Sequence, residues 1–231
     1  MNTLTRPILR EERIGNQRLI LGDCLQVMPT LGRFDSVVTD PPYGIGSWSA
    51  TGGNSLSQEE CDKINAWDSA AFVPDALALA FAAAPMQIVW GGNYFDLPPC
   101  VGPLLWNKQL RGMHYADGEF AWRNFGKSLR ILDLSIQGTE VRQSGRKHPT
   151  QKPVALMEWC LGFLPGAKTI LDPFMGSGTT LVACQRMGRH GTGIELDPDY
   201  FDIACRRVDE AARQADMFIP KPATPVQEGF L

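Results

Sequence analysis

Short apolar runs alternate with helical patterns along most of the chain, and this alternation limits the fold more than any other feature. Strand-like segments cover 18–22, 34–40, 86–92, 104–108, 118–125, 169–172 and 191–196, and helical patterns cover 24–31, 71–84, 153–164, 179–188 and 198–215. Strands separated by helices indicate βαβ units and a parallel sheet. The sequence therefore predicts an α/β fold of three layers, built around a doubly wound, mostly parallel sheet.

The size and composition of the chain indicate one domain. Its 231 residues suffice for one well-buried core but hardly for two full domains, so we expect a single domain over 1–215 and a surface tail over 216–231. No apolar run is long enough to cross a bilayer and no export signal pattern is present, so a cytoplasmic protein is expected. The six cysteines are scattered without a C-x-x-C pair, which favours reduced, buried thiols over disulfides or a metal site.

The charge of the chain is unevenly distributed. Residues 106–152 hold nine Lys and Arg against four acids, a local charge of +5 that leaves −8 for the rest of a chain with net charge −3. An acidic body with one basic stretch indicates a local phosphate-binding face, or else a solvated loop with a chance excess of base. The candidate phosphate contacts in this stretch are Arg123, Arg130, Arg142 and Arg146.

The nine residues DPFMGSGTT, from Asp172 to Thr180, join a strand to a helix. Gly176 and Gly178 allow a tight turn and the close approach of a ligand, and the helix after them offers free N–H groups. Glu195 lies 23 residues after Asp172, at the end of the next strand. A carboxylate in that position can accept hydrogen bonds from both hydroxyls of a ribose, so the pair of features predicts a nucleoside site.

Two common nucleotide-binding motifs do not match this turn. Leu181 occupies the third glycine position of a dinucleotide fingerprint, and no lysine follows the glycines as a P-loop requires. The ligand is therefore expected to be a nucleoside without a large phosphate demand, and S-adenosyl-L-methionine fits. Asp172 would receive its amino group and the N–H groups of the turn its carboxylate.

A second motif, Asp40-Pro41-Pro42-Tyr43, ends an earlier strand and suits methylation of an exocyclic amine. Such an amine is a poor nucleophile because its lone pair is delocalised into the ring of the base. The Asp40 carboxylate and the Pro41 carbonyl can each accept one N–H and so aim the lone pair at a methyl group. The prolines fix φ and remove donors, and Tyr43 offers a flat face to a base taken out of the stack. These four residues are the predicted catalytic residues, and no metal is required.

Taken together, DPPY followed by DPFMGSGTT resembles the permuted beta group of the DNA N6-adenine/N4-cytosine amino-methyltransferases, and the chain length resembles the small methylases of phages and prophages. The segment 148–153, HPTQKP, matches the one that precedes the cofactor turn in that group. The segment 90–95, WGGNYF, resembles the strand that backs the target-base pocket. The resemblance covers roughly 17–208.

The resemblance implies the S-adenosylmethionine-dependent methyltransferase fold, a seven-stranded sheet with one antiparallel strand. It implies that Asp23 and Cys24 meet the adenine of the cofactor, that Asp40 reaches its amino group, and that Thr150 and Lys152 lie near its methionine end. An Asp at the start of DPPY favours adenine N6 as the target. The predicted cofactor-binding residues are Asp23, Cys24, Asp40, Thr150, Lys152, Asp172, Pro173, Phe174, Gly176, Ser177, Gly178, Thr179, Glu195 and Leu196.

The chain is short for this family, which leaves little sequence for reading double-stranded DNA. We expect 106–147 to be a small DNA-recognition region and 44–70 to be either a mobile loop that closes over the substrate or a disordered insertion. A very short recognition site, promiscuous methylation and a surface supplied by a homodimer all remain open. So do N4-cytosine or RNA as substrate, a catalytically inactive DNA-binding regulator, and a partner nuclease in a restriction-modification pair.

Overall fold

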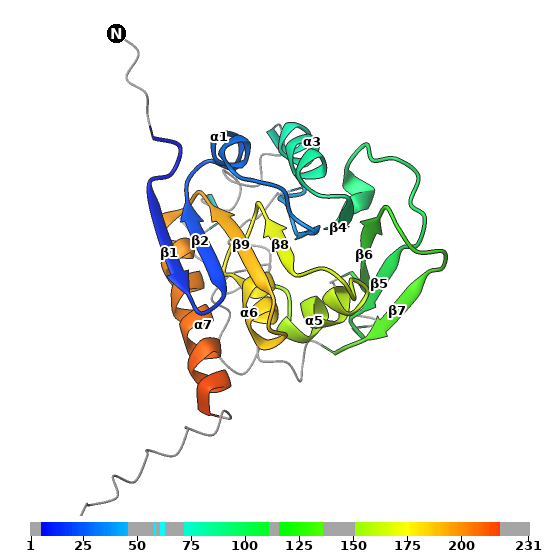
Figure 1. Ribbon diagram of the computed structural model, residues 1–231. Coiled ribbons are helices and arrows are strands. Elements are labelled where there is room, and N and C mark those ends of the chain that lie inside the picture. The colour runs from blue at the N-terminus through cyan, green and yellow to red at the C-terminus, as the bar shows by residue number, and fades with distance from the viewer. Residues whose placement is uncertain are drawn as a thin grey trace, which may run out of the picture.

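The computed structural model describes residues 6–45, 58, 61–62, 72–110, 116–135 and 151–217 of the chain. Within these ranges nine strands form one sheet in the order β1-β2-β9-β8-β3-β4-β6-β5-β7 (Figure 1). The strands are β1 Arg10–Ile14, β2 Gln17–Leu21, β3 Ser36–Thr39, β4 Met86–Trp90, β5 Leu104–Asn107, β6 Gly118–Arg123, β7 Arg130–Asp133, β8 Thr169–Asp172 and β9 His190–Glu195. The helices are α1 Cys24–Val27, η1 Met28–Thr30, α3 Val73–Ala83, η3 Gly92–Tyr94, α5 Val154–Gly162, α6 Thr179–Arg186 and α7 Pro198–Met217.

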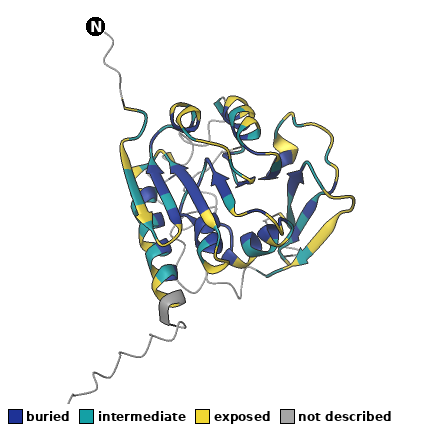
Figure 2. Cartoon of the chain, in the orientation of Figure 1, coloured by how far each residue is buried: buried dark blue, intermediate teal, exposed yellow. Residues whose placement is uncertain are grey.

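The centre of the sheet confirms the predicted topology. Strands β2, β9, β8, β3 and β4 are parallel, β6 is antiparallel to both of its neighbours, and β5 returns to the parallel direction. These seven strands, with one antiparallel, are the ones expected. The sheet is wider than predicted because β1 and β7 extend its two edges. Both edge strands carry charged residues and contain no fully buried residue, so they lack the apolar pattern by which the other strands were predicted (Figure 2).

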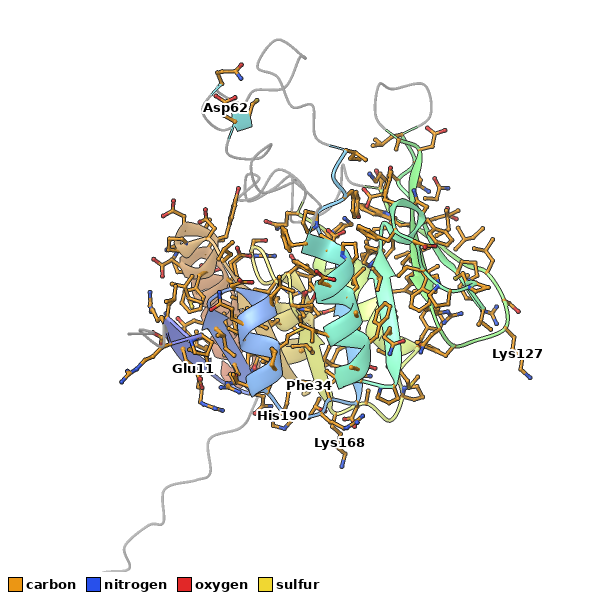
Figure 3. The ribbon with its side chains drawn as sticks, turned by 90° about the horizontal axis from the view of Figure 1, so that it is seen from above. Glu11, Phe34, Asp62, Lys127, Lys168 and His190 are labelled. Atoms are coloured by element: carbon orange, nitrogen blue, oxygen red, sulfur yellow. The ribbon has the colours of Figure 1, made fainter. Side chains whose placement is uncertain are left out.

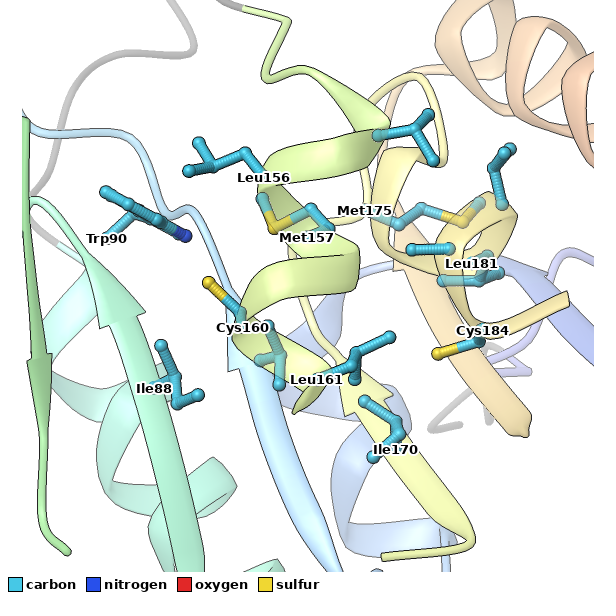
Figure 4. Packing of buried hydrophobic residues seen from close by; sticks show 14 of the residues in the cluster. Ile88, Trp90, Leu156, Met157, Cys160, Leu161, Ile170, Met175, Leu181 and Cys184 are labelled. Carbon is cyan, nitrogen blue, oxygen red and sulfur yellow. The ribbon is translucent and has the colours of Figure 1, made fainter. Parts of the chain in front are cut away.

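Helices cover both faces of the sheet, as the three-layer prediction requires. Helices α5, α6 and α7 lie on one face and α1 and α3 on the other (Figure 1). Because successive strand residues point to opposite faces, Val38 packs under the first group of helices while Val37 packs under the second. Figure 4 shows the first core, where Met157 and Leu161 of α5 fill the space above the sheet.

The predicted loops and tail lie mostly outside the described residues. This holds for 46–57, 59–60 and 63–70 of the expected loop, for 111–115 and 136–150 of the basic stretch, and for 218–231 of the tail. The described part of 106–147 forms β6, β7 and the ends of their neighbours in the main sheet. No described helix is long and apolar enough to cross a membrane.

Candidate active site

The loops that follow parallel strands meet at one edge of the sheet, and the described residues of the predicted motifs lie there. Because β2, β9, β8 and β3 are consecutive neighbours, their ends bring Asp23, Glu195, Asp172 and Asp40 into one row. Hydrogen bonds connect neighbouring strand ends in this row. The Gly22 N–H donates to the Glu195 carbonyl over 2.8 Å, and the Thr39 hydroxyl donates to the Asp172 Oδ1 over 2.7 Å.

The glycine-rich turn has the tight conformation that the sequence predicts. Gly176 has φ +51° and Gly178 has φ +79°, both in the left-handed region. A Cβ on Gly178 would also lie 2.9 Å from the Cβ of Ala204 in α7. The turn is fastened to β9, because the Met175 N–H donates to the Ile194 carbonyl over 3.0 Å.

An arginine that the sequence did not point to braces this turn from α7. Arg207 Nη1 donates to the Ser177 carbonyl over 2.6 Å, to the Ser177 hydroxyl over 2.8 Å and to the Thr179 hydroxyl over 3.0 Å. The Ser177 hydroxyl in turn donates to Gln151 Oε1 over 3.3 Å. Arg207 thus connects the turn to the last helix, and Ser177 connects it to the segment that carries Lys152.

Two carboxylates flank the turn, and neutral donors hold both. Asp172 is buried and accepts from the Thr39 hydroxyl, from the Phe174 N–H over 3.2 Å and from Thr180. Burial raises the pKa of Asp172 to about 6, against the lowering effect of these hydrogen bonds.

Glu195 accepts three backbone N–H groups, from Gly176 over 2.9 Å, from Leu196 over 2.9 Å and from Asp197 over 2.8 Å. Burial nevertheless raises the pKa of Glu195 to about 7. A carboxylate has about four acceptor positions, so Glu195 keeps capacity for a further hydroxyl donor.

Asp23 and Cys24 begin the short helix α1 beside Glu195. The Asp23 carboxylate caps this helix, with Oδ1 accepting from the Leu25 N–H over 2.9 Å and Oδ2 accepting from the Gln26 side chain over 3.1 Å. Cys24 is buried, and burial raises the pKa of its thiol to about 12. The thiol is therefore neutral and apolar in character, which suits contact with a purine ring and not nucleophilic chemistry.

The Asp40 carboxylate is engaged on both oxygens by side chains. The Tyr43 hydroxyl donates to Oδ1 over 2.5 Å, and Lys152 Nζ donates to Oδ2 over 2.6 Å and to the Tyr43 hydroxyl over 3.2 Å. Burial raises the pKa of Asp40 above its usual range, while the Lys152 ammonium opposes that rise. Burial alone would lower the pKa of Lys152, but Asp40 and its other anionic neighbours raise it well above the usual value.

A second carboxylate, Glu119 of β6, reaches the same ammonium. Its Oε2 lies 3.0 Å from Lys152 Nζ, and its Oε1 forms an ion pair with Lys108 at the end of β5. Burial would raise the pKa of Glu119, yet the two lysines hold it at about 2. The signal for this residue lies in the alternation of its strand, because Glu119 takes the same side as the buried Ala121 and Arg123.

The Tyr43 ring is held by residues of the segment after β4. It stacks on Tyr94 with ring centroids 4.9 Å apart and planes inclined by 20°, and it meets Phe95 edge-on at 6.3 Å. Gly91 makes the approach possible, since it has φ +67° and a Cβ there would lie 2.1 Å from the Tyr43 ring. Tyr94, half of it exposed, forms the outer face of this aromatic stack.

The structure places the other predicted residues as follows. Pro41 and Pro42 are buried beneath the Asp40 loop, and Pro173 is buried at the start of the glycine-rich turn. Leu196 is 64% exposed beside Glu195, an apolar side chain open to solvent at the carboxyl edge of the sheet. Thr150 lies outside the described residues.

Part of the basic stretch is not a phosphate-binding surface. Arg123, predicted as a phosphate contact, is 3% exposed, and its guanidinium donates to the carbonyls of Gly102 and Ser128, so this prediction is wrong. A strand position facing the core overrides the tendency of arginine to face solvent. Lys127 and Arg130 are exposed, and Figure 3 shows Lys127 projecting from the rim of the molecule.

The row of groups fits S-adenosylmethionine. An exposed leucine next to a carboxylate with spare acceptor capacity suits a nucleoside. Gly176 and Gly178, both in the left-handed region, leave two positions of the turn without a side chain. Within the described ranges no group of three or more His, Cys, Asp or Glu could hold a metal ion.

Comparison with known proteins identifies the family. A DNA methylase family model, N6_N4_Mtase, matches residues 85–206. The Type II methyltransferase M.ScaI of Streptomyces caespitosus is 43% identical over 252 residues, covering 83% of this chain and 81% of its own. The Type II methyltransferase M2.DpnII of Streptococcus pneumoniae is 34% identical over 110 residues, and the matched part is only 41% of that protein.

The fold agrees with a solved relative. The crystal structure of the M1.HpyAVI–SAM complex aligns with a TM-score of 0.53 at 23% identity, over 84% of this chain and 99% of the other. The predicted fold class is thereby confirmed, and the match to the DNA methylase family supports the predicted cofactor, S-adenosylmethionine. The chain belongs to the N6/N4 family of DNA methylases.

Proposed function

We propose that this protein transfers a methyl group from S-adenosylmethionine to the N6 amino group of an adenine flipped out of double-stranded DNA. The observation that carries this proposal is the Asp40 carboxylate at the end of β3, which is ion-paired with Lys152. The residue before it, Thr39, donates its hydroxyl to Asp172 at the start of the glycine-rich turn, so Asp40 lies close to the proposed cofactor site. An amine that is to be alkylated needs an acceptor in that place, because its N–H groups must be held while its lone pair faces the methyl donor.

The bound cofactor would supply an electrophilic methyl group on a sulfonium. Asp40 would accept one N–H of the target amine, the Pro41 carbonyl would accept the other, and Asp40 would take the proton that the alkylated nitrogen releases. The Lys152 ammonium opposes the rise in the pKa of Asp40 that burial causes, and so favours the ionised acceptor. Tyr43 and Tyr94 would provide the flat surface for the flipped base, a contact of about 1–3 kcal/mol.

The cofactor would lie along the ends of β8, β9 and β2. Asp172 and the N–H groups of the turn would hold its amino acid part, Glu195 its ribose, and Leu196 with Cys24 its adenine. The role of Thr150 follows from the family resemblance, whereas for Lys152 the contact with Asp40 supports a place at the target amine and not only at the methionine end.

Adenine as the target rests on the Asp of DPPY, and cytosine N4 is the alternative. The test incubates the protein with labelled S-adenosylmethionine and unmodified DNA, digests the product to nucleosides and separates them by mass spectrometry. We expect N6-methyldeoxyadenosine. N4-methyldeoxycytidine would overturn the assignment of the base, and label transfer by Asp40→Ala equal to the unchanged protein would overturn the catalytic assignment.

The recognition sequence can be read by single-molecule sequencing of DNA from cells that express the protein. The name Type II methyltransferase, which M.ScaI and M2.DpnII carry, supports a place in a restriction-modification pair. A nuclease that cuts only unmethylated copies of the same site would demonstrate that place.

A further inference from the structure

Four charged side chains of alternating sign form a half-buried to buried row that ends at the proposed catalytic carboxylate. In order they are Lys108, Glu119, Lys152 and Asp40, with side-chain exposures of 12%, 23%, 5% and 20%. Lys152 Nζ lies 2.6 Å from the Asp40 Oδ2 and 3.0 Å from the Glu119 Oε2. One ammonium therefore contacts two carboxylates, one at the end of β3 and one in β6, and these two strands lie on either side of β4 in the sheet.

The two carboxylates hold the ammonium in different ways. Lys152 donates hydrogen bonds to Asp40 and to the Tyr43 hydroxyl. The Glu119 Oε2 is buried and lies 3.0 Å from Lys152 Nζ, farther than the 2.6 Å that separates Nζ from the Asp40 Oδ2, so it attracts the same ammonium from a slightly greater distance. Glu119 thus draws on the charge of Lys152 without displacing it from Asp40.

This division matters for an acceptor that must bind an amine. An ammonium committed entirely to Asp40 would neutralise the carboxylate and weaken its attraction for the N–H groups of the substrate. A missing ammonium would leave a buried carboxylate that is easily protonated, and a carboxylic acid cannot serve as the same acceptor. A second carboxylate beside the ammonium would hold Asp40 between these two states, neither fully neutralised by Lys152 nor left without a cation.

We propose that Glu119 is a positioning residue for methyl transfer, which holds Lys152 between two carboxylates and so keeps Asp40 both ionised and available to the target amine. This inference rests on the proposed function. Lys108 acts on the same network through Glu119, because it forms an ion pair with Glu119 and does not contact Asp40.

The neighbours of Asp40 fix the direction of each effect. The groups that face it are Tyr43, Lys152, Glu119 and, across Thr39, Asp172. Removing the negative charge of Glu119 should let Asp40 titrate at lower pH. Removing the positive charge of Lys152 or Lys108 should make it titrate at higher pH. Opposite movements on substituting two residues in contact are not expected from loss of packing alone.

The first experiment follows the Asp40 carboxyl by carbon-13 NMR in protein labelled at aspartate carboxyls, with Asp40→Asn to assign the signal. Glu119→Gln should move the midpoint to lower pH, and Lys152→Met and Lys108→Met should move it to higher pH. Asp117→Asn is the matched control, since Asp117 is an exposed acid two residues from Glu119. A Glu119→Gln midpoint equal to that of the control would overturn the proposal. Lys108→Met keeps the test open if Glu119→Gln fails to fold.

The second experiment measures the pH profile of kcat/KM for methyl transfer. Glu119→Gln should reduce kcat roughly tenfold, the size of one hydrogen bond weakened in the transition state, and shift the acid limb to lower pH with the KM for S-adenosylmethionine unchanged. A reduced kcat with an unshifted profile would indicate a structural role and contradict the inference. Absence of methyl transfer by the unchanged protein on any DNA would contradict the proposed function instead, and the NMR midpoints would still test the charge coupling.

Discussion

The carboxylates on the two halves of the sheet edge are stabilised by different means. Asp172 and Glu195, on the proposed cofactor side, accept hydrogen bonds from hydroxyls and backbone N–H groups, and burial raises their pKa values to about 6 and about 7. Asp40 and Glu119, on the proposed base side, share the ammonium of Lys152. The comparison teaches that one side is built to hold a ligand with neutral dipoles, and the other to keep a charge in a buried place.

The largest expected effect removes the charge on the base side. Asp40→Asn should reduce kcat by roughly 10²–10³-fold, the loss typical of one group that stabilises a transition state. If Asp172 and Glu195 hold the cofactor by their own hydrogen bonds, affinity for S-adenosylmethionine should change by less than about threefold, whereas the contact of Asp40 with its amino group that the family resemblance implies would lower it further. Single-turnover methylation and calorimetric titration of the cofactor measure the two quantities, and a parallel loss of both would contradict the separation of the two sides.

The next effect concerns Glu195 and the pH dependence of the free energy of unfolding. Glu195 binds its proton more tightly in the folded chain, at about 7, than the usual value of 4.5 in the unfolded chain. Its contribution to stability is therefore complete below about pH 4.5 and is lost as the pH rises through 7.

Between pH 5 and pH 8 this one group should remove about 2–3 kcal/mol from the free energy of unfolding of the cofactor-free protein. Glu195→Gln should lack that part of the slope in urea titrations at the two pH values. An equal slope in both proteins would show that Glu195 is not the group responsible.

A smaller effect concerns the affinity for the cofactor. Glu195→Gln should weaken S-adenosylmethionine binding by roughly 10–100-fold, the range for a lost hydrogen bond to a charged group. Saturating cofactor should restore most of kcat, in contrast to Asp40→Asn. Failure of excess cofactor to restore the rate would place Glu195 in the chemistry and not in binding.

The smallest effect lies outside both sides, on the exposed end of the basic stretch. Lys127→Met should weaken DNA binding by about two- to threefold at moderate salt and reduce the salt dependence by about one counterion. Fluorescence anisotropy over a salt series measures both. Asp133→Asn, on the neighbouring strand, is a control that should not weaken binding.

On the proposed cofactor side, the placement of the described residues could be predicted largely from the sequence. Its turn is nine consecutive residues, its carboxylates end predicted strands, and the order of parallel strands brings those ends together. The strand and helix bounds differ from the predicted ones by only a few residues, because the apolar pattern of the central strands is strong.

The base side could be predicted only in part. Asp40 and Tyr43 lie three positions apart in the sequence, but Lys152 and Glu119 reach them from segments more than seventy residues away. Their meeting depends on β6 running antiparallel beside β4, which brings Glu119 to the end of the sheet where β3 stops. Local composition showed only a basic stretch, and it could not distinguish the buried Arg123 from the exposed Lys127.

The pairing of β2 with β9 has a consequence for how the chain acquires its structure during synthesis. Strand β2 is synthesised early, yet its parallel partner β9 is the last strand of the sheet in chain order. Strand β3 likewise pairs with β8, which is synthesised much later. Until residues 169–195 emerge, one edge of β3 and the apolar Ile20 and Val37 have no cover from the second half of the chain. The nascent protein therefore exposes an unpaired strand edge and apolar residues to misassociation for most of its translation. The glycine-rich turn is among the last segments that must be synthesised before the sheet can be completed.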